Sequence, residues 1–403
     1  QDVIGKRALV VSLCQNSIGS VVGYLSFLNA RIVPIMLNAH LEQELLVNLL
    51  STYLPEYLWV PLDMVTSGQV EDVLKAVKEN EKSKTDGATR KTKENIQIIY
   101  SVYDYSLIQT GFEKKYELYP ELGLLLTTSG STGSPKFVRQ SYDNIRANAK
   151  SIVEYLKLDE TERPITTLPM NYTYGLSIIN SHAMVGATLL VTEKSLMQKE
   201  FWAFFKEEKA TSFGGVPYTY EILDKLRFMR MELPTLRTMT QAGGKLTPEL
   251  HAKFAAYAKE KGKNFVVMYG QCEATARMGY LPADMAVEKC GSMGIAIPGG
   301  KFVLMDADGE EIQEPHVTGE LVYEGANVTL GYAECGKDLA KGDERKGLLQ
   351  TGDMAQFDED GYYYIVGRKK RFLKIYGNRV NLDEIDRLIK AKFDNIDVAS
   401  AGV

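Results

Sequence analysis

The amino-acid sequence predicts an α/β protein in which helices cover both faces of parallel sheets, followed by a β-rich part. From residue 7 to about residue 74, and again from about residue 137 to residue 293, apolar strand-like runs alternate with helical stretches. That alternation is typical of parallel βαβ units. From Gly294 onward the strands are short and turn sequences recur, at 306–309, 324–327 and 358–361, which is typical of hairpins.

Length, composition and charge are those of an ordinary globular protein. The 403 residues are 45% hydrophobic and 25% charged, enough for two or three subdomains with large cores. A net charge of −5 gives no indication of nucleic acid or an anionic membrane as a partner. The four cysteines show no paired spacing, and no signal peptide or membrane-spanning run is apparent, so we expect a reduced, cytoplasmic protein without a membrane span. Because the chain enters a strand almost at once and stops in an apolar run, we expect both ends to be cut.

The first elements follow from apolar runs and capping residues. Residues 7–13 and 31–37 are expected to be buried strands, and Asn16 or Ser17 can cap the helix between them. Residues 79–95 are lysine-rich with almost no apolar side chains, which predicts an exposed, mobile excursion. A basic phosphate-binding run is the less favoured interpretation of the same residues.

After this excursion strands and helices alternate again. Helical periodicity indicates helices at 142–156, 196–207 and 217–226. Apolar runs indicate strands at 122–126, 164–169, 188–192, 210–215, 236–241 and 265–269. Thr247 followed by Pro248 is a favourable start for a further helix.

The stretch after the strand at 122–126 is well suited to an anion. Six hydroxyl side chains in residues 127–134 surround Gly130 and Gly133, so the backbone can turn sharply and present N–H groups to a phosphate. Lys136 adds a positive charge, and Pro135 stiffens the exit. The spacing differs from that of the usual P-loop, and a solvated hairpin has the same composition. The loop alone therefore leaves a phosphate site and a plain hairpin equally open.

A second candidate is the turn after the strand at 265–269. Tyr269 ends the strand, Gly270 has no side chain, and Glu273 is expected at the start of the next helix. Tyrosine can stack on a base, and glutamate can ligate a hard cation. Cys272 has no histidine near it in sequence, so we expect it to be a small buried residue rather than a nucleophile.

Three further stretches suit a ligand but also have a purely structural interpretation. The aromatic run at 169–176 lies between a strand and a helix, where open α/β sheets bind ligands, yet it could be a packing loop. Gly243 and Gly244 allow the backbone to approach a flat ligand or simply to turn tightly. Asp353 follows Gly352 at the start of an alternating strand, either as a ligand carboxylate or as a turn acid.

Taken together, these stretches resemble the adenylate-forming (AMP-binding) superfamily, in particular acyl-CoA synthetases and other AMP-dependent synthetase-ligases. Four motifs carry the resemblance: Thr-Ser-Gly-Ser-Thr-Gly-Ser-Pro-Lys at 128–136, Tyr-Gly-x-x-Glu at 269–273, Thr-Gly-Asp at 351–353 and Gly-Arg-Lys-Lys at 367–370. They occur in the family's order, and the resemblance spans nearly the whole chain.

The resemblance implies a large domain over residues 1–369, made of αβα-layered subdomains to about 293 and a β-rich subdomain over 294–369. Residues 370–403 would form the hinge and the start of a small α+β C-terminal domain. The family's usual catalytic lysine lies near the end of that domain, beyond Val403, so we expect the C-terminal domain to be truncated.

The resemblance also implies a role for each matching residue. Lys136, Glu273 and Lys374 would be catalytic, and Lys370 would be the hinge. Thr128 and Glu273 would hold Mg²⁺. Contacts to ATP or AMP are implied for Thr128, Ser129, Gly130, Ser131, Thr132, Gly133, Gly243, Gly244, Tyr269, Gly270, Gln271, Asp353 and Arg368. Tyr172, Gly215 and Val216 would line the acyl pocket.

The implied reaction activates a carboxylic acid with ATP as an acyl adenylate. The acyl group then passes to a thiol, on coenzyme A or on the phosphopantetheine of an acyl carrier protein. In this family Asp353 would accept hydrogen bonds from the ribose hydroxyls, and Lys374 would begin a loop that faces the active site for thioester formation.

Two departures from the family pattern keep alternatives open. Tyr172 stands where acyl-CoA synthetases often have a histidine, and the absence of an acid between residues 169 and 181 argues mildly against an amino-acid-activating ligase that loads a carrier protein. Cys272 replaces the family's threonine and is a poor hydrogen-bond donor, which is also compatible with a non-catalytic nucleotide-binding module. A structural or interaction protein is least favoured, because it would not need Asp353 and Arg368.

Overall fold

The computed structural model describes residues 3–84, 97–112, 116–127, 136–375, 378–382, 385–386, 389 and 398–401. Within these residues the strands form sheets of eight, five, four and two strands. The chain is therefore α/β in its first three hundred residues and antiparallel β thereafter, as the sequence predicts.

The first sheet has a parallel centre and antiparallel edges. In spatial order its strands are β15 (Gly331–Ala333), β7 (Phe137–Ser141), β6 (Leu122–Thr127), β2 (Val33–Asn38), β1 (Leu9–Cys14), β3 (Tyr57–Pro61), β5 (Tyr105–Gln109) and β4 (Gln97–Val102). The helices that follow its first strands are α1 (Ile18–Asn29), α2 (Gln43–Tyr53), α3 (Leu62–Thr66) and α4 (Gln69–Lys84). The edge strand β15 joins this sheet although it comes almost two hundred residues after β7 in the chain.

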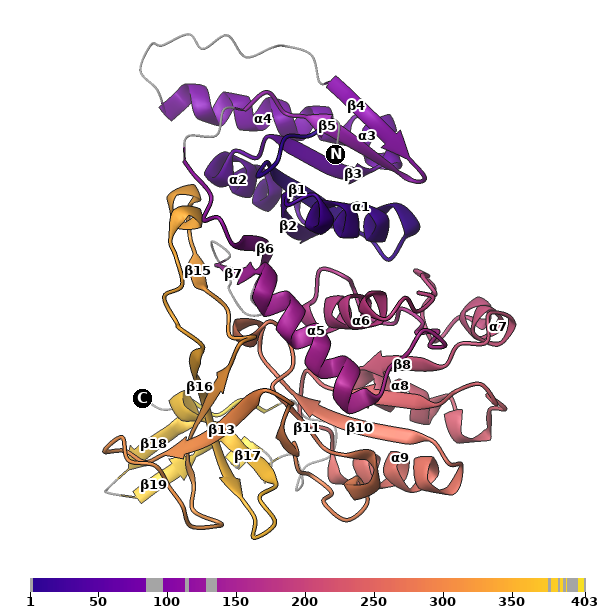
Figure 1. Ribbon diagram of the computed structural model, residues 1–403, viewed down its shortest axis with the longest axis vertical. Helices are drawn as coiled ribbons and strands as arrows, with labels where there is room; N and C mark the ends of the chain where they lie inside the picture. The colour runs from indigo at the N-terminus through magenta and orange to yellow at the C-terminus, as the bar shows by residue number, and fades with distance from the viewer. Residues whose placement is uncertain are drawn as a thin grey trace.

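The second sheet is parallel over three strands and packs around aromatic side chains. Its strands are β8 (Ser212–Gly215), β9 (Thr238–Gln241) and β10 (Asn264–Tyr269), continued antiparallel by β11 (Gly279–Tyr280) and β12 (Ile295–Ala296). Its helices are α7 (Lys199–Glu207), α8 (Pro217–Lys225) and α9 (Pro248–Glu260). Fully buried rings fill its core: Phe201, Phe205, Tyr220, Phe228, Phe254 and Phe265. Two helices, α5 (Tyr142–Leu156) and α6 (Thr173–Met184), pack against each other between the two sheets (Figure 1).

The third sheet is antiparallel and lies at the C-terminal end of the molecule, beside the second sheet (Figure 1). Its strands are β13 (Gly300–Met305), β14 (Gly319–Gly325), β16 (Leu348–Phe357) and β17 (Tyr363–Arg368). A single 3-10 turn, η5 (Lys369–Arg371), leads from β17 into the hairpin of β18 (Phe372–Ile375) and β19 (Asn378–Asn381).

The capping residues act as the sequence predicts. Ser17 is the N-cap of α1, and Thr247 is the N-cap of α9, with Pro248 in its first turn. The helix predicted at 142–156 is α5, and its N-cap Ser141 exchanges hydrogen bonds with Asn144 in a capping box. Each cap satisfies backbone N–H groups that a helix end otherwise leaves unpaired.

Three local predictions are wrong. Residues 79–84 continue α4, whereas the sequence predicts an exposed excursion from residue 79. The helix is anchored by the buried side chains of Val70, Val73 and Val77, and the Glu and Lys residues that follow favour its continuation. The strands predicted at 164–169 and 188–192 are reduced to isolated bridges. Glu273 lies in a single 3-10 turn, η2 (Cys272–Ala274), and not at the start of an α-helix, since Thr275 turns the backbone to a φ of +65°.

Within the described residues, no helix has both the length and the apolar character needed to span a membrane.

Candidate active site

The carboxyl ends of three parallel strands bring together most of the predicted site residues that the structure describes. β8 ends at Gly215, β9 ends just before Gly243, and β10 ends at Tyr269. Because these strands are parallel neighbours, their ends meet at one edge of the second sheet. That edge is where open α/β sheets bind ligands.

Asp353 is the centre of the first cluster at this edge. Its side chain is 4% exposed, and its carboxylate accepts hydrogen bonds from Gln271 Nε2 at 2.8 Å and from the Tyr269 hydroxyl. Arg368, its partner across the β16–β17 ladder, contacts the other carboxylate oxygen through Nε at 2.9 Å. Burial first, and then the neighbouring Asp353 carboxylate, raise the pKa of Tyr269 well above its usual value. The cluster therefore combines a buried, oriented carboxylate with a phenol that remains protonated.

The second cluster is built around Tyr332, for which the sequence analysis predicts no role. The Tyr332 hydroxyl donates to Glu273 Oε1 at 2.7 Å, and Lys136 Nζ lies over the Tyr332 ring, 4.5 Å from its centroid. Lys136 also forms an ion pair with Glu334 at 3.1 Å. Tyr332 therefore links Lys136 and Glu273, two residues for which the family resemblance implies a catalytic role.

The turn at 269–273 connects these two clusters. Tyr269 and Gln271 contact Asp353, whereas Glu273, two residues further on, contacts Tyr332. The turn is held in place by the segment before β15: Thr329 donates to the backbone oxygen of Glu273 through both its N–H, at 3.0 Å, and its hydroxyl, at 2.9 Å. A single short loop thus positions both a candidate ribose site and a candidate phosphate site.

The third cluster contains the residues expected around the acyl pocket. Tyr172 is the N-cap residue of α6, and Val216 is the N-cap residue of α8. Gly243 lies against both of them: a Cβ added there would be 2.5 Å from the Tyr172 hydroxyl oxygen and 3.1 Å from Val216 Cγ1. The φ of Gly243 is +81°, in the left-handed region that glycine tolerates. Burial raises the pKa of Tyr172, with Cys272 as a lesser cause.

Cys272 is buried, as the sequence predicts, with 9% of its surface exposed. Gly270 permits a close contact, because a Cβ there would collide with the backbone oxygen of Ala276. Both residues therefore shape the turn that carries Tyr269 and Glu273. The prediction of a small buried residue at Cys272 is confirmed.

Several predicted residues cannot be placed. Thr128, Ser129, Gly130, Ser131, Thr132 and Gly133 lie outside the described residues. Lys374 lies in β18 and Lys370 in η5, but nothing is described of the Lys374 side chain. Roles for these residues stay predictions.

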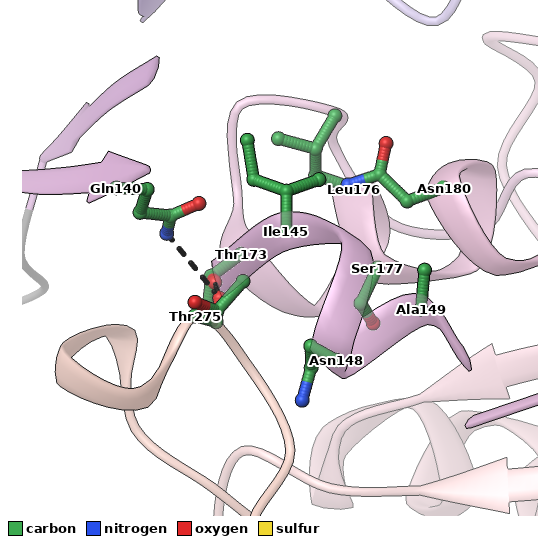
Figure 2. Close-up of a pocket in the computed structure, with 9 residues that line it drawn as sticks. All are labelled: Gln140, Ile145, Asn148, Ala149, Thr173, Leu176, Ser177, Asn180 and Thr275. Carbon is green, nitrogen blue, oxygen red and sulfur yellow. Dashed lines mark hydrogen bonds between the residues drawn. The ribbon is translucent and has the colours of Figure 1, made fainter. Parts of the chain in front are cut away.

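A different cavity, between α5 and α6, is not part of this site (Figure 2). Polar side chains from both helices line it, among them Asn148, Ser177 and Asn180, together with Thr275. Its volume is about 10 Å³, which is room for one water molecule and too little for an acyl group. Asn148, one of the lining residues, has a buried Oδ1 without a hydrogen-bond partner among the described residues, so the cavity suits a single bridging water.

The residues present fit Mg²⁺ only in combination with phosphate groups. The described part of the chain contains no group of three or more acidic, histidine or cysteine side chains that could cage a metal. Glu273 supplies one carboxylate, which contacts the same tyrosine as Lys136. This arrangement suits Mg²⁺, which is commonly held by one or two carboxylates together with nucleotide phosphates and water.

Similarity to known proteins covers most of the chain. Residues 3–333 match the family model described as AMP-binding enzyme. The chain is 30% identical over 277 residues to an oxalate–CoA ligase of Arabidopsis thaliana, covering 67% of this chain and 53% of that protein. It is 31% identical over 289 residues to an indoleacetate–CoA ligase of Aromatoleum aromaticum, covering 70% of this chain and 55% of that protein. The chain spans about half the length of the curated relatives it matches.

Solved structures share the fold. An O-succinylbenzoate coenzyme A synthetase from Bacillus subtilis, in complex with AMP, superimposes with a TM-score of 0.73 at 20% identity, over 96% of this chain and 74% of that one. The N-terminal domain of FACL13 from Mycobacterium tuberculosis, with a bound inhibitor, gives a TM-score of 0.69 at 20% identity. This match covers 91% of this chain and 87% of that one.

Proposed function

Because the chain belongs to the AMP-binding enzyme family, we propose that it acts as an AMP-forming acid–thiol ligase, which activates a carboxylic acid with ATP and passes the acyl group to a thiol. The observation that carries the proposal is the convergence on Asp353 of Tyr269, Gln271 and Arg368, from two separate stretches of chain. A turn acid with no ligand would not need a buried position and three such partners.

In the proposed site, Asp353 accepts hydrogen bonds from the ribose hydroxyls. Arg368 and Gln271 hold its carboxylate in one orientation, and Tyr269 lies beside it at the end of β10. Gly243 and Gly244, after β9, provide backbone that a flat adenine ring can approach.

In the first step, an oxygen of the substrate carboxylate attacks the α-phosphorus of ATP. The bond to the bridging oxygen breaks, and pyrophosphate leaves. Negative charge on the phosphate oxygens is stabilised by Lys136, and Glu273 would hold Mg²⁺, which when bound supplies further positive charge at the phosphates. The predicted metal contact of Thr128 and the loop contacts at 129–133 belong to the same proposal.

In the second step, a thiol attacks the acyl carbon and AMP leaves. We propose coenzyme A as the thiol, because the relatives described above are named CoA ligases. A phosphopantetheine carrier is the alternative acceptor. Lys374 would act at this step, since it lies just beyond the proposed hinge at Lys370.

The acid itself is proposed to enter beside Tyr172, Val216 and Gly215. These residues lie at the edge of the second sheet, next to the apolar cluster of Leu168, Tyr174, Ala242, Val266 and Met268. A mainly apolar pocket favours an acid without an α-amino group. If only α-amino acids were substrates, this part of the proposal would be wrong.

Pyrophosphate exchange tests the proposal. The full-length protein is incubated with ATP, Mg²⁺ and labelled pyrophosphate, with a panel of carboxylic acids that includes α-amino acids. We expect acid-dependent incorporation of label into ATP. No exchange with any acid, in a protein that still binds ATP, would instead support the non-catalytic nucleotide-binding module.

A further inference from the structure

Tyr332 contacts charged side chains from three separate segments of the chain. Its hydroxyl donates to Glu273, after β10; its ring lies under Lys136 Nζ, before β7; and Arg345 Cζ, before β16, lies 4.5 Å from the same ring centroid. We propose that Tyr332 is a positioning residue that aligns Lys136, Arg345 and Glu273 on the polyphosphate of ATP, and that Arg345 is a further phosphate-neutralising cation. This inference rests on the proposed function, since it concerns the same nucleotide site.

The main chain fixes the position of Tyr332 independently of any ligand. In the β15–β7 ladder Tyr332 lies opposite Val138. Lys136 is two residues before Val138 and so projects from the same face, diagonally across from Tyr332. Arg139, which is fully buried, donates to the Tyr332 backbone oxygen through Nε at 2.9 Å and also binds the oxygens of Leu330 and Gly342. The ring therefore stands at a fixed place beside Lys136.

The hydroxyl of Tyr332 serves to orient Glu273. The hydroxyl is the donor in this contact, since the carboxylate oxygen of Glu273 can only accept. One carboxylate oxygen of Glu273 is thereby committed to Tyr332 at 2.7 Å. Outer partners of this kind hold a metal-binding carboxylate in one orientation.

Lys136 and Arg345 differ in whether a carboxylate neutralises their positive charge. Lys136 is paired with Glu334, but both side chains are well exposed, at 43% and 68%, so a polyphosphate can replace Glu334. Arg345 donates to the Glu273 backbone oxygen at 3.1 Å and to the Thr329 hydroxyl at 2.5 Å, and forms no ion pair with any carboxylate in the described part of the chain. A half-buried guanidinium without a carboxylate partner, bonded to the backbone oxygen of Glu273 and in contact with the same ring as Lys136, suits an anionic ligand.

Three substitutions separate the parts of this assembly. Tyr332→Phe keeps the ring under both cations and removes only the hydrogen bond to Glu273. Tyr332→Leu removes the ring as well. Arg345→Met removes the proposed phosphate cation while keeping much of the side-chain volume. As matched controls, Tyr24→Phe removes a buried hydroxyl with a 2.8 Å hydrogen bond in α1, and Arg146→Met removes an exposed arginine of α5.

The measurement is calorimetric binding of ATP and of AMP to the full-length protein, each with and without Mg²⁺. For Tyr332→Phe we expect the same ATP affinity as the wild type when Mg²⁺ is absent. The factor by which Mg²⁺ increases ATP affinity should be about tenfold smaller in this variant than in the wild type. For Arg345→Met and Tyr332→Leu we expect ATP affinity to fall about tenfold or more while AMP affinity stays within about twofold. The two control variants should match the wild type in all four measurements.

Equal losses for ATP and AMP would show a merely structural role and overturn the inference, as would an unchanged Mg²⁺ effect in Tyr332→Phe. If Tyr332→Leu fails to fold, the phenylalanine and methionine variants still decide the outcome. Because the readout is binding, it is independent of turnover. A wild-type protein that binds ATP but exchanges no pyrophosphate would contradict the proposed function and leave this test intact.

Discussion

At the residue scale, Asp353 has the most clearly defined surroundings of the candidate ligand residues. It lies in β16 directly after Gly352, a sequence that is also common in exposed turns. Its side chain, however, is buried and contacts both β17 and the turn after β10. A carboxylate held in this way loses little freedom when a ligand binds. It is thus preorganised to accept hydrogen bonds from two neighbouring hydroxyls.

Asp353→Ala should weaken binding of ATP and AMP alike by roughly 1.5–3 kcal/mol, the value of a hydrogen bond to a charged group. Calorimetry measures the affinities, and thermal unfolding checks that the variant remains folded. Asp306→Ala, an exposed turn acid after β13, is the control and should bind normally. Equal affinities in the wild type and Asp353→Ala would rule out the ribose assignment.

Gly243 makes a second residue-scale prediction. Gly243→Ala should lower the free energy of unfolding by more than Gly68→Ala does. Both glycines have a φ of +81°, so each alanine carries the same backbone penalty of about 1 kcal/mol. Only at Gly243 would the added Cβ also approach the Tyr172 hydroxyl, at 2.5 Å, whereas nothing lies within 4 Å at Gly68.

Thermal and denaturant unfolding of the two alanine variants measures this difference. Adding Tyr172→Phe to Gly243→Ala should restore part of the loss, because it removes the atom that the Cβ meets. Equal destabilisation at Gly68 and Gly243 would mean that the Tyr172 ring moves aside at no cost.

At the element scale, α6 combines two tasks. It begins directly after Tyr172, a residue of the candidate acyl pocket, and its last turn contains the buried residues Ser181 and His182. His182, in that last turn, is 3% exposed, and its Nδ1 is 2.8 Å from the backbone oxygen of Ile178. Burial, the main cause, lowers the pKa of His182 to about 4, so the ring is neutral in the folded protein.

This burial predicts a pH dependence of stability. Between pH 6.5 and about 4 the unfolded chain binds a proton at His182 that the folded chain does not, so the free energy of unfolding falls as the pH falls through this window. The total loss should be about 3 kcal/mol, since each pKa unit corresponds to about 1.4 kcal/mol. Above pH 6.5 the ring is neutral in both states and contributes no pH dependence.

Denaturant unfolding between pH 4 and pH 7 measures the effect. His182→Gln should remove this part of the pH dependence, whereas His40→Gln, at an exposed position, should retain it. Parallel stability-versus-pH curves for the wild type and His182→Gln would contradict the prediction.

At the scale of the whole molecule, the site is assembled from distant parts of the chain. The turn after β10 belongs to the second sheet, Asp353 to the third, and Tyr332 to the edge of the first. All three sheets must therefore pack correctly before the candidate nucleotide site exists. The proposed hinge at Lys370 follows immediately, in the 3-10 turn between β17 and β18.

Lys370→Pro should separate the two half-reactions in the full-length protein. Proline fixes φ and removes the backbone N–H, so the segment after β17 would be held in one orientation. We expect adenylate formation to be retained and thioester formation to be lost in single-turnover assays. Lys370→Ala is the control and should keep both steps. A variant in which both half-reactions fall equally, or neither changes, would remove the hinge assignment.

The sequence by itself determined the fold class and most helices and strands, and it singled out Asp353 together with the three residues that contact its side chain. Apolar runs and caps mark these elements because burial and capping are local requirements, as α5 shows residue by residue. The prediction that Glu273 starts an α-helix was wrong. The positive φ at Thr275 ends the turn, and the sequence does not indicate it because threonine seldom adopts such a conformation. The sequence also predicted strands at 164–169 and 188–192, where tertiary packing leaves only isolated bridges.

Only the tertiary structure decided how the candidate residues are arranged. The sequence predicts no role for Tyr332 or Arg345. Their place became visible when β15 paired with β7 across almost two hundred residues and brought the Tyr332 ring into contact with Lys136 and its hydroxyl to Glu273. In the same way, Gln271 and Arg368 meet at Asp353 because one follows a strand of the second sheet and the other pairs with β16 in the third. Contacts of this kind depend on strand register between distant segments, which local sequence patterns do not encode.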